Sequence, residues 1–101
     1  MINFFNTHIS QDAVKKVAEV LSSTFVSEGK LVVEFEKKLT SELGISNPVA
    51  LNSGTSALHL ALVLAGVQSG DEVILPAQTF IASGLAVKYV GATPVCADIQ
   101  Y

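Results

Sequence analysis

The stretch that decides the fold is PVALNSGTSAL, residues 48–58. Within it, the apolar run Val49-Ala50-Leu51 stops at Asn52-Ser53-Gly54, and apolar residues then recur at helical spacing from Ala57 onward. A short apolar run bounded by turn residues is typical of a buried strand, whereas the recurrence is typical of a helix. We therefore predict a strand, a tight turn and a helix that ends at Gly66, a residue suited to the left-handed position past a helix end.

The same alternation continues downstream. A second strand is predicted at residues 72–75, closed by Pro76, which cannot continue a central ladder. A helix is predicted at residues 81–90 and a third strand at residues 93–97. Because successive strand–helix–strand units form right-handed crossovers, we expect an α/β fold, a mostly parallel sheet with helices on its faces.

Two amphipathic helices are predicted upstream. Ser10 can cap the first, whose apolar residues recur at helical spacing over residues 14–21. The period resumes over residues 32–43, and Gly44 is suited to end the second helix.

The domain organisation follows from these elements. Tyr101 comes directly after the third predicted strand, with no helix to cover the sheet beyond it. We therefore expect a single partial domain over residues 1–101, with an amino-terminal helical segment at 1–47 and the start of an α/β domain at 48–101.

Composition limits the partners and the compartment. Half of the residues are apolar and only 15% are charged, so part of the apolar surface is expected to meet something outside this chain. The net charge is −3 with six scattered lysines, which gives no footprint for nucleic acid. No apolar stretch reaches the roughly 20 residues that span a bilayer, and the amino terminus has no signal-peptide pattern. We expect no membrane association.

Cysteine and histidine usage indicates the compartment and argues against a metal site. The single Cys96 cannot form an internal disulfide, and its apolar neighbours indicate a buried thiol in a reducing compartment, so we expect a cytoplasmic protein. One cysteine and two distant histidines, His8 and His59, do not make a metal site.

The turn at residues 52–56 is a candidate anion site. The first N–H groups of a helix are free and its dipole favours negative charge. Gly54 allows the backbone to approach a phosphate closely, and the hydroxyls of Ser53, Thr55 and Ser56 can add hydrogen bonds. The alternative is an ordinary helix cap, since serine followed by glycine is common there. The turn matches neither a P-loop nor the dinucleotide fingerprint.

Phe80 is the second candidate. It lies in PAQTFIAS, residues 76–83, at the carboxyl end of the second predicted strand, where open parallel sheets bind their ligands. An aromatic ring at that edge can stack on a flat heteroaromatic cofactor. The alternative is that Phe80 packs in the core of the domain.

Five blocks taken together resemble the DegT/DnrJ/StrS family of sugar aminotransferases, in that family's order and spacing. The blocks are GKLVVEFE (29–36), NSGTSAL (52–58), GDEVI (70–74), PAQTFIA (76–82) and GATPV (91–95), followed by Asp98. Each block alone is weak, but together they cover nearly the whole chain.

The resemblance implies a fold-type-I enzyme that uses pyridoxal 5′-phosphate. Such an enzyme moves an amino group from an amino acid, usually glutamate, onto a nucleotide-linked keto-sugar for amino-sugar and surface polysaccharide biosynthesis, and the full-length protein is expected to be a homodimer. By the same likeness Gly54, Thr55 and Ser56 map to the phosphate-binding turn, and Phe80 maps to the aromatic position stacked on the pyridine ring.

The family's Schiff-base lysine and pyridine-binding aspartate correspond to positions beyond residue 101. We therefore assign no catalytic residue to this chain and expect the isolated fragment to be inactive. Asp98 matches an earlier family aspartate and is interpreted as structural. A function of a different class, a non-catalytic phosphate-binding or interaction module, stays open on the residues alone.

Overall fold

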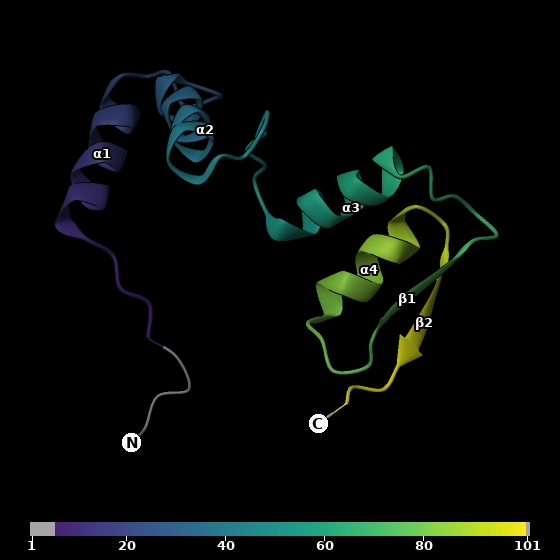
Figure 1. Ribbon diagram of the computed structural model, residues 1–101. Coiled ribbons are helices and arrows are strands. Elements are labelled where there is room, and N and C mark those ends of the chain that lie inside the picture. Colours follow the sequence, from purple (N-terminus) through teal and green to yellow (C-terminus); the bar gives the residue numbers. More distant parts are fainter. Residues whose placement is uncertain (1–5, 101) are drawn as a thin grey trace. The chain divides into compact units, whose positions relative to one another are not determined.

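A computed structural model describes residues 6–100, and the chain divides into two compact units, Met1–Ala50 and Leu51–Tyr101 (Figure 1). Within residues 6–100, the first unit contains two helices, and the second contains two helices and two strands.

The helices of the first unit begin and end as their sequence predicts. Helix α1 spans Gln11–Ser22, and the Ser10 hydroxyl caps it by accepting a hydrogen bond of 3.2 Å from the N–H of Ala13. Helix α2 spans Lys30–Leu43 and ends at Gly44, whose φ of 68° is the left-handed conformation that glycine adopts without strain. Both predicted helices are confirmed.

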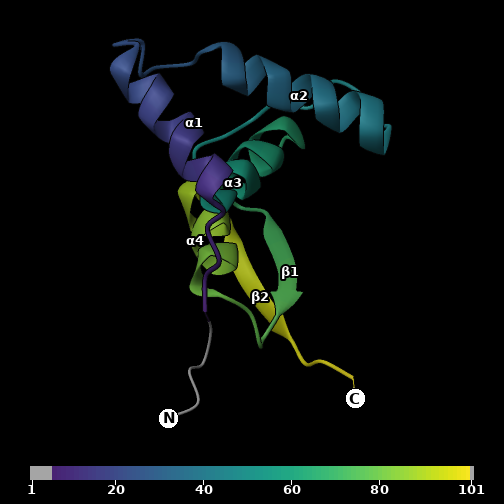
Figure 2. The same cartoon turned by 90° about the vertical axis from the view of Figure 1, so that its left-hand side faces the viewer.

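The second unit is built on a small parallel sheet. Strands β1 (Glu72–Pro76) and β2 (Thr93–Ala97) pair in parallel, with Glu72 opposite Thr93 and Pro76 opposite Ala97, as their side-by-side course in Figure 2 shows. Helix α4 (Ile81–Tyr89) connects them and packs on the sheet, and helix α3 (Gly54–Leu64) packs along α4. This α/β arrangement confirms the predicted fold class.

One predicted strand is wrong. Residues 49–51 form no strand, so the sheet of the described residues has two strands and not three. A strand needs a neighbour to complete its ladder. In its place, the N–H of Ala50 donates a hydrogen bond of 2.8 Å to the carboxylate of Glu36.

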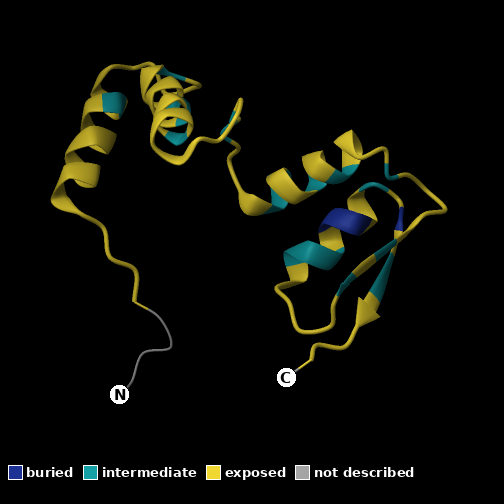
Figure 3. Cartoon of the chain, viewed as in Figure 1, coloured by how far each residue is buried: buried dark blue, intermediate teal, exposed yellow. Residues whose placement is uncertain are grey.

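The buried core is small. Among the described residues, only Ala86, Val87 and Ala92 are buried hydrophobics, and Figure 3 shows them confined to α4 and the loop after it. Large apolar side chains remain exposed, Leu64 at 78% and Ile74 at 74%. The thiol of Cys96 is also exposed, so the expectation that it is buried is wrong. The apolar surplus of the composition therefore lies largely on the surface of the described residues.

Candidate functional site

The turn before α3 is a helix cap with free backbone donors. Ser53 is the N-cap, in an extended conformation, and its hydroxyl accepts a hydrogen bond of 3.2 Å from the N–H of Ser56. Over residues 6–100, the N–H groups of Gly54 and Thr55 have no such partner. Two backbone donors and the hydroxyl of Thr55 are thus available at the positive end of the α3 dipole.

Ser56 is engaged within this turn. Its hydroxyl donates a hydrogen bond of 2.8 Å to Oδ1 of Asn52 and lies 3.0 Å from the hydroxyl of Ser53. These bonds hold the first turn of α3 in shape without using its free N–H groups. Asn52 and Ser53 therefore order the turn, while Gly54 and Thr55 offer donors to a ligand.

Gly54 is not required by the fold of the turn. Its φ lies outside the left-handed region, and a Cβ built on it would meet no protein atom within 4 Å. Neither backbone strain nor packing demands glycine here. A side chain at this position would extend into the open space in front of the amino terminus of α3.

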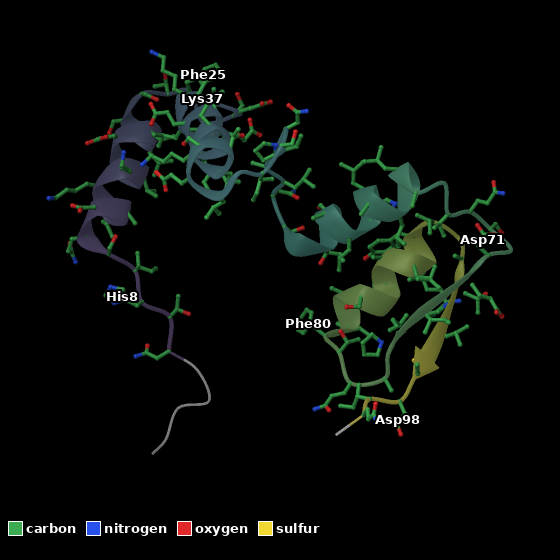
Figure 4. The ribbon with its side chains drawn as sticks, in the orientation of Figure 1. His8, Phe25, Lys37, Asp71, Phe80 and Asp98 are labelled. Carbon is green, nitrogen blue, oxygen red and sulfur yellow. The ribbon has the colours of Figure 1, made fainter. Side chains whose placement is uncertain are left out.

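Phe80 occupies a position where local physics disfavours it. It is the N-cap of α4, a position that favours serine, threonine, aspartate or asparagine, and it makes no side-chain cap. Its side chain is 79% exposed and in Figure 4 projects away from β1 and β2. Phe80 therefore does not pack in the core of this unit.

The two segments line one hollow. Gly54, Thr55, Ala57 and Leu58 of α3 face Phe80, Ala82 and Ser83 at the start of α4 across an open space of about 600 Å³, here called the α3–α4 hollow. Neither α3 nor α4 carries an acidic residue in its first turn. The hollow therefore has anion-binding donors on one wall and an exposed aromatic ring on the other, with no negative side chain in either first turn.

Comparison with known proteins decides the family. The DegT/DnrJ/EryC1/StrS aminotransferase family matches residues 7–101. The chain belongs to this aminotransferase family. Its curated relatives include the GDP-perosamine synthase of Caulobacter vibrioides, 49% identical over 81% of this chain and 22% of the relative. The spore coat polysaccharide biosynthesis protein SpsC of Bacillus subtilis is 42% identical over 91% of this chain and 24% of the relative.

Solved structures share the fold of this chain. A protein from Streptococcus pneumoniae classed as a sugar aminotransferase, in its PLP form, is 39% identical with a TM-score of 0.88 over 98% of this chain and 25% of that one. NtdA from Bacillus subtilis with bound cofactor PMP is 35% identical with a TM-score of 0.80, over 91% and 22%. The chain thus spans about a quarter of the length of the family members it matches.

Other polar residues of this aminotransferase chain have structural partners. The ring of His59 meets the ring of Tyr89 edge-on at 5.6 Å, which joins α3 to α4. The carboxylate of Asp71 accepts a hydrogen bond of 2.9 Å from the N–H of Gln68, so Asp71 shapes the turn before β1. Asp98 accepts one of 2.9 Å from the N–H of Ile99 after β2. Figure 4 shows Asp71 and Asp98 away from Phe80.

No lysine of this chain lies in the α3–α4 hollow, and all six are exposed. Across residues 6–100 there is also no cluster of three or more metal-ligating side chains. In the same part of the chain, no helix is long and apolar enough to cross a bilayer.

Sequence reasoning missed two hydroxyl links that shape the hollow. One is the Ser56–Asn52 hydrogen bond, and the other joins the hydroxyls of Thr79 and Ser83 at 3.0 Å. In both pairs the two residues are four positions apart at a helix start. Each pair joins the residue before an N-cap to the third residue of the helix, and polar side chains at these two positions were the available signal.

Proposed function

We propose that this chain supplies the pyridoxal phosphate cradle of an aminotransferase that moves an amino group from an amino acid onto a nucleotide-linked keto-sugar. The observation that supports it most directly is the α3–α4 hollow, which combines an uncommitted helix N-terminus with an exposed aromatic ring. Relatives named for perosamine and for spore coat polysaccharide support a role in amino-sugar and surface polysaccharide biosynthesis.

The residues present fit the cofactor. The N–H groups of Gly54 and Thr55 and the hydroxyl of Thr55 would bind its phosphate, and the empty space at Gly54 would admit the phosphate oxygens. Ser56 would be the last residue of the phosphate-binding turn, and its hydrogen bond to Asn52 keeps it in place. Phe80 would cover one face of the pyridine ring.

When bound, pyridoxal phosphate supplies the aldehyde and the electron-withdrawing ring that amino-group transfer requires. This chain would bind the phosphate, orient the ring and exclude water from the ring face that Phe80 covers. We place the catalytic lysine and the pyridine-binding aspartate outside residues 1–101, so the 101-residue chain by itself is proposed to be inactive.

The proposal extends to the complete protein. It would be a cytoplasmic homodimer that takes its amino group from glutamate or a similar amino acid. Residues 1–47 would form an amino-terminal helical segment, and residues 48–101 would begin the domain that binds the cofactor.

The test compares three ligands on the full-length enzyme containing these residues: pyridoxal phosphate, pyridoxal and inorganic phosphate. We expect pyridoxal phosphate to bind most tightly, and Thr55→Val to weaken its binding by about 1.5–3 kcal/mol through loss of a hydrogen bond to a charged group. Transfer of nitrogen from glutamate to a nucleotide-linked keto-sugar, followed as 2-oxoglutarate formed, is the functional measurement.

Two results would contradict the proposal. Binding of inorganic phosphate without binding of pyridoxal phosphate would favour the non-catalytic phosphate-binding module. An unchanged affinity in the Thr55→Val enzyme would show that the hydroxyl of Thr55 does not bind the phosphate.

A further inference from the structure

Helix α4 begins with an unusual arrangement at Phe80. The N-cap position carries an aromatic side chain and makes no cap, so one usual means of fixing the first turn of a helix is missing. The N–H of Ser83 still donates to the carbonyl of Phe80 at 3.0 Å. An exposed ring on an uncapped terminus is otherwise free to change its direction, because few contacts restrain it.

A hydrogen bond between two side chains spans Phe80 at this uncapped helix start. Thr79 precedes the N-cap and Ser83 lies in the first turn of α4, and their hydroxyls are 3.0 Å apart. The bond bridges the backbone that bears Phe80, so Thr79 and Ser83 close a loop around this residue. Ser83 is half-buried and lines the α3–α4 hollow.

We propose that Thr79 and Ser83 are positioning residues that hold the ring of Phe80 at the α3–α4 hollow, in the direction in which it can stack on the cofactor. They act through Phe80 and need not contact the cofactor. The inference rests on the proposed function, because it assumes that Phe80 stacks on pyridoxal phosphate. A helix start with an aromatic ring at its capping position lacks the usual side-chain restraint, and this hydroxyl pair provides one.

The test measures pyridoxal phosphate affinity and the visible circular dichroism of the bound cofactor in the full-length enzyme. Thr79→Val and Ser83→Ala each break the same hydrogen bond, so each is expected to raise the Kd about threefold to tenfold and to alter the dichroism. The double variant is expected to be no worse than either single one, because both remove one interaction. Thr79→Ser keeps the hydroxyl and is expected to restore the wild-type values.

Two controls separate positioning from general stability. Thr40→Val removes a threonine hydroxyl from α2, also exposed and bonded within its helix, and is expected to leave Kd and dichroism unchanged. In a Phe80→Ala background, Thr79→Val is expected to have no further effect on Kd, because the ring through which it acts is gone.

The outcomes distinguish this inference from the proposed function. If Phe80→Ala raises the Kd but Thr79→Val and Ser83→Ala do not, the positioning role is overturned and the cofactor site stands. If Thr79→Val weakens binding equally with and without the ring, the pair does not act through Phe80, and the inference is also overturned. If Phe80→Ala itself leaves Kd unchanged, the assignment of the ring position is wrong and the inference falls with it.

Discussion

Replacing Gly54 by alanine should maintain or raise the stability of the apo-enzyme but lower its affinity for pyridoxal phosphate. Gly54 is the first residue of α3, its φ is not left-handed, and a Cβ there would meet no protein atom within 4 Å. Alanine is therefore compatible with the folded backbone and reduces the conformational freedom of the unfolded chain. We expect the Gly54→Ala apo-enzyme to be as stable as the wild type or more stable, by up to about 1 kcal/mol.

Cofactor affinity should fall in the same variant. The new methyl group would occupy the space that the phosphate needs, and forcing one extra methyl group into a filled site costs about 1–3 kcal/mol. That cost corresponds to an increase in the Kd for pyridoxal phosphate of about 5- to 150-fold. Pyridoxal lacks the phosphate, so its affinity is expected to be unchanged.

The assay is equilibrium binding of both ligands to the full-length apo-enzyme, with thermal unfolding measured on the same samples. A loss of stability in Gly54→Ala would show that the fold of the turn requires glycine, contrary to the geometry. An equal loss of affinity for pyridoxal and pyridoxal phosphate would show that the variant disturbs the whole hollow. Unchanged affinity for both ligands would refute the assignment of the phosphate to this turn.

Two further substitutions test the other wall of the hollow and the turn that closes α4. Phe80→Ala is expected to raise the Kd for pyridoxal phosphate more than Phe80→Tyr, which keeps the ring, and to leave thermal unfolding of the apo-protein nearly unchanged because Phe80 is 79% exposed. Unfolding of the Phe80→Ala apo-protein would restore the core-packing alternative. Gly91→Ala is expected to lower the free energy of unfolding by about 1–2 kcal/mol for the left-handed φ of 79°, plus the contact of the new Cβ with Ser69 at 3.3 Å. Gly66→Ala is the control, because Gly66 has a similar φ of 77° and a Cβ built on it would meet no atom within 4 Å. The difference between the two variants in the free energy of unfolding, measured with denaturant, gives the cost of the Ser69 contact. Equal losses in both variants would show that this contact costs nothing.

Most secondary structure was predictable because its signals are local. The cap at Ser10 and the left-handed glycine Gly44 depend on residues within a few positions of each other, and both are found where the pattern places them. The absence of the strand expected at residues 49–51 was not predictable in this way. A strand depends on a neighbour distant in sequence, and here Glu36, fourteen positions from Ala50, takes the backbone N–H that a ladder would use.

The candidate site was also predictable only in part, because only some of its features are local in sequence. The phosphate turn and Phe80 were identifiable as separate motifs, since each is a short pattern at a helix start. That they line one hollow depends on the packing of α3 along α4, which no local pattern states. Thr79 and Ser83 were overlooked because threonine and serine are each ordinary residues at a helix start, and their contact at 3.0 Å is seen only in the structure.

Strand β1 is apolar on both of its faces, but the described residues bury only one of them. Its burial alternates, with Val73 and Leu75 half-buried toward α3 and α4 and Ile74 on the other face, 74% exposed. An antiparallel strand with one wet face would carry a polar residue at that position, whereas successive apolar residues are typical of a parallel sheet covered on both faces. Val73, Ile74 and Leu75 therefore have the composition of an interior parallel strand, although residues 6–100 cover only one face of it.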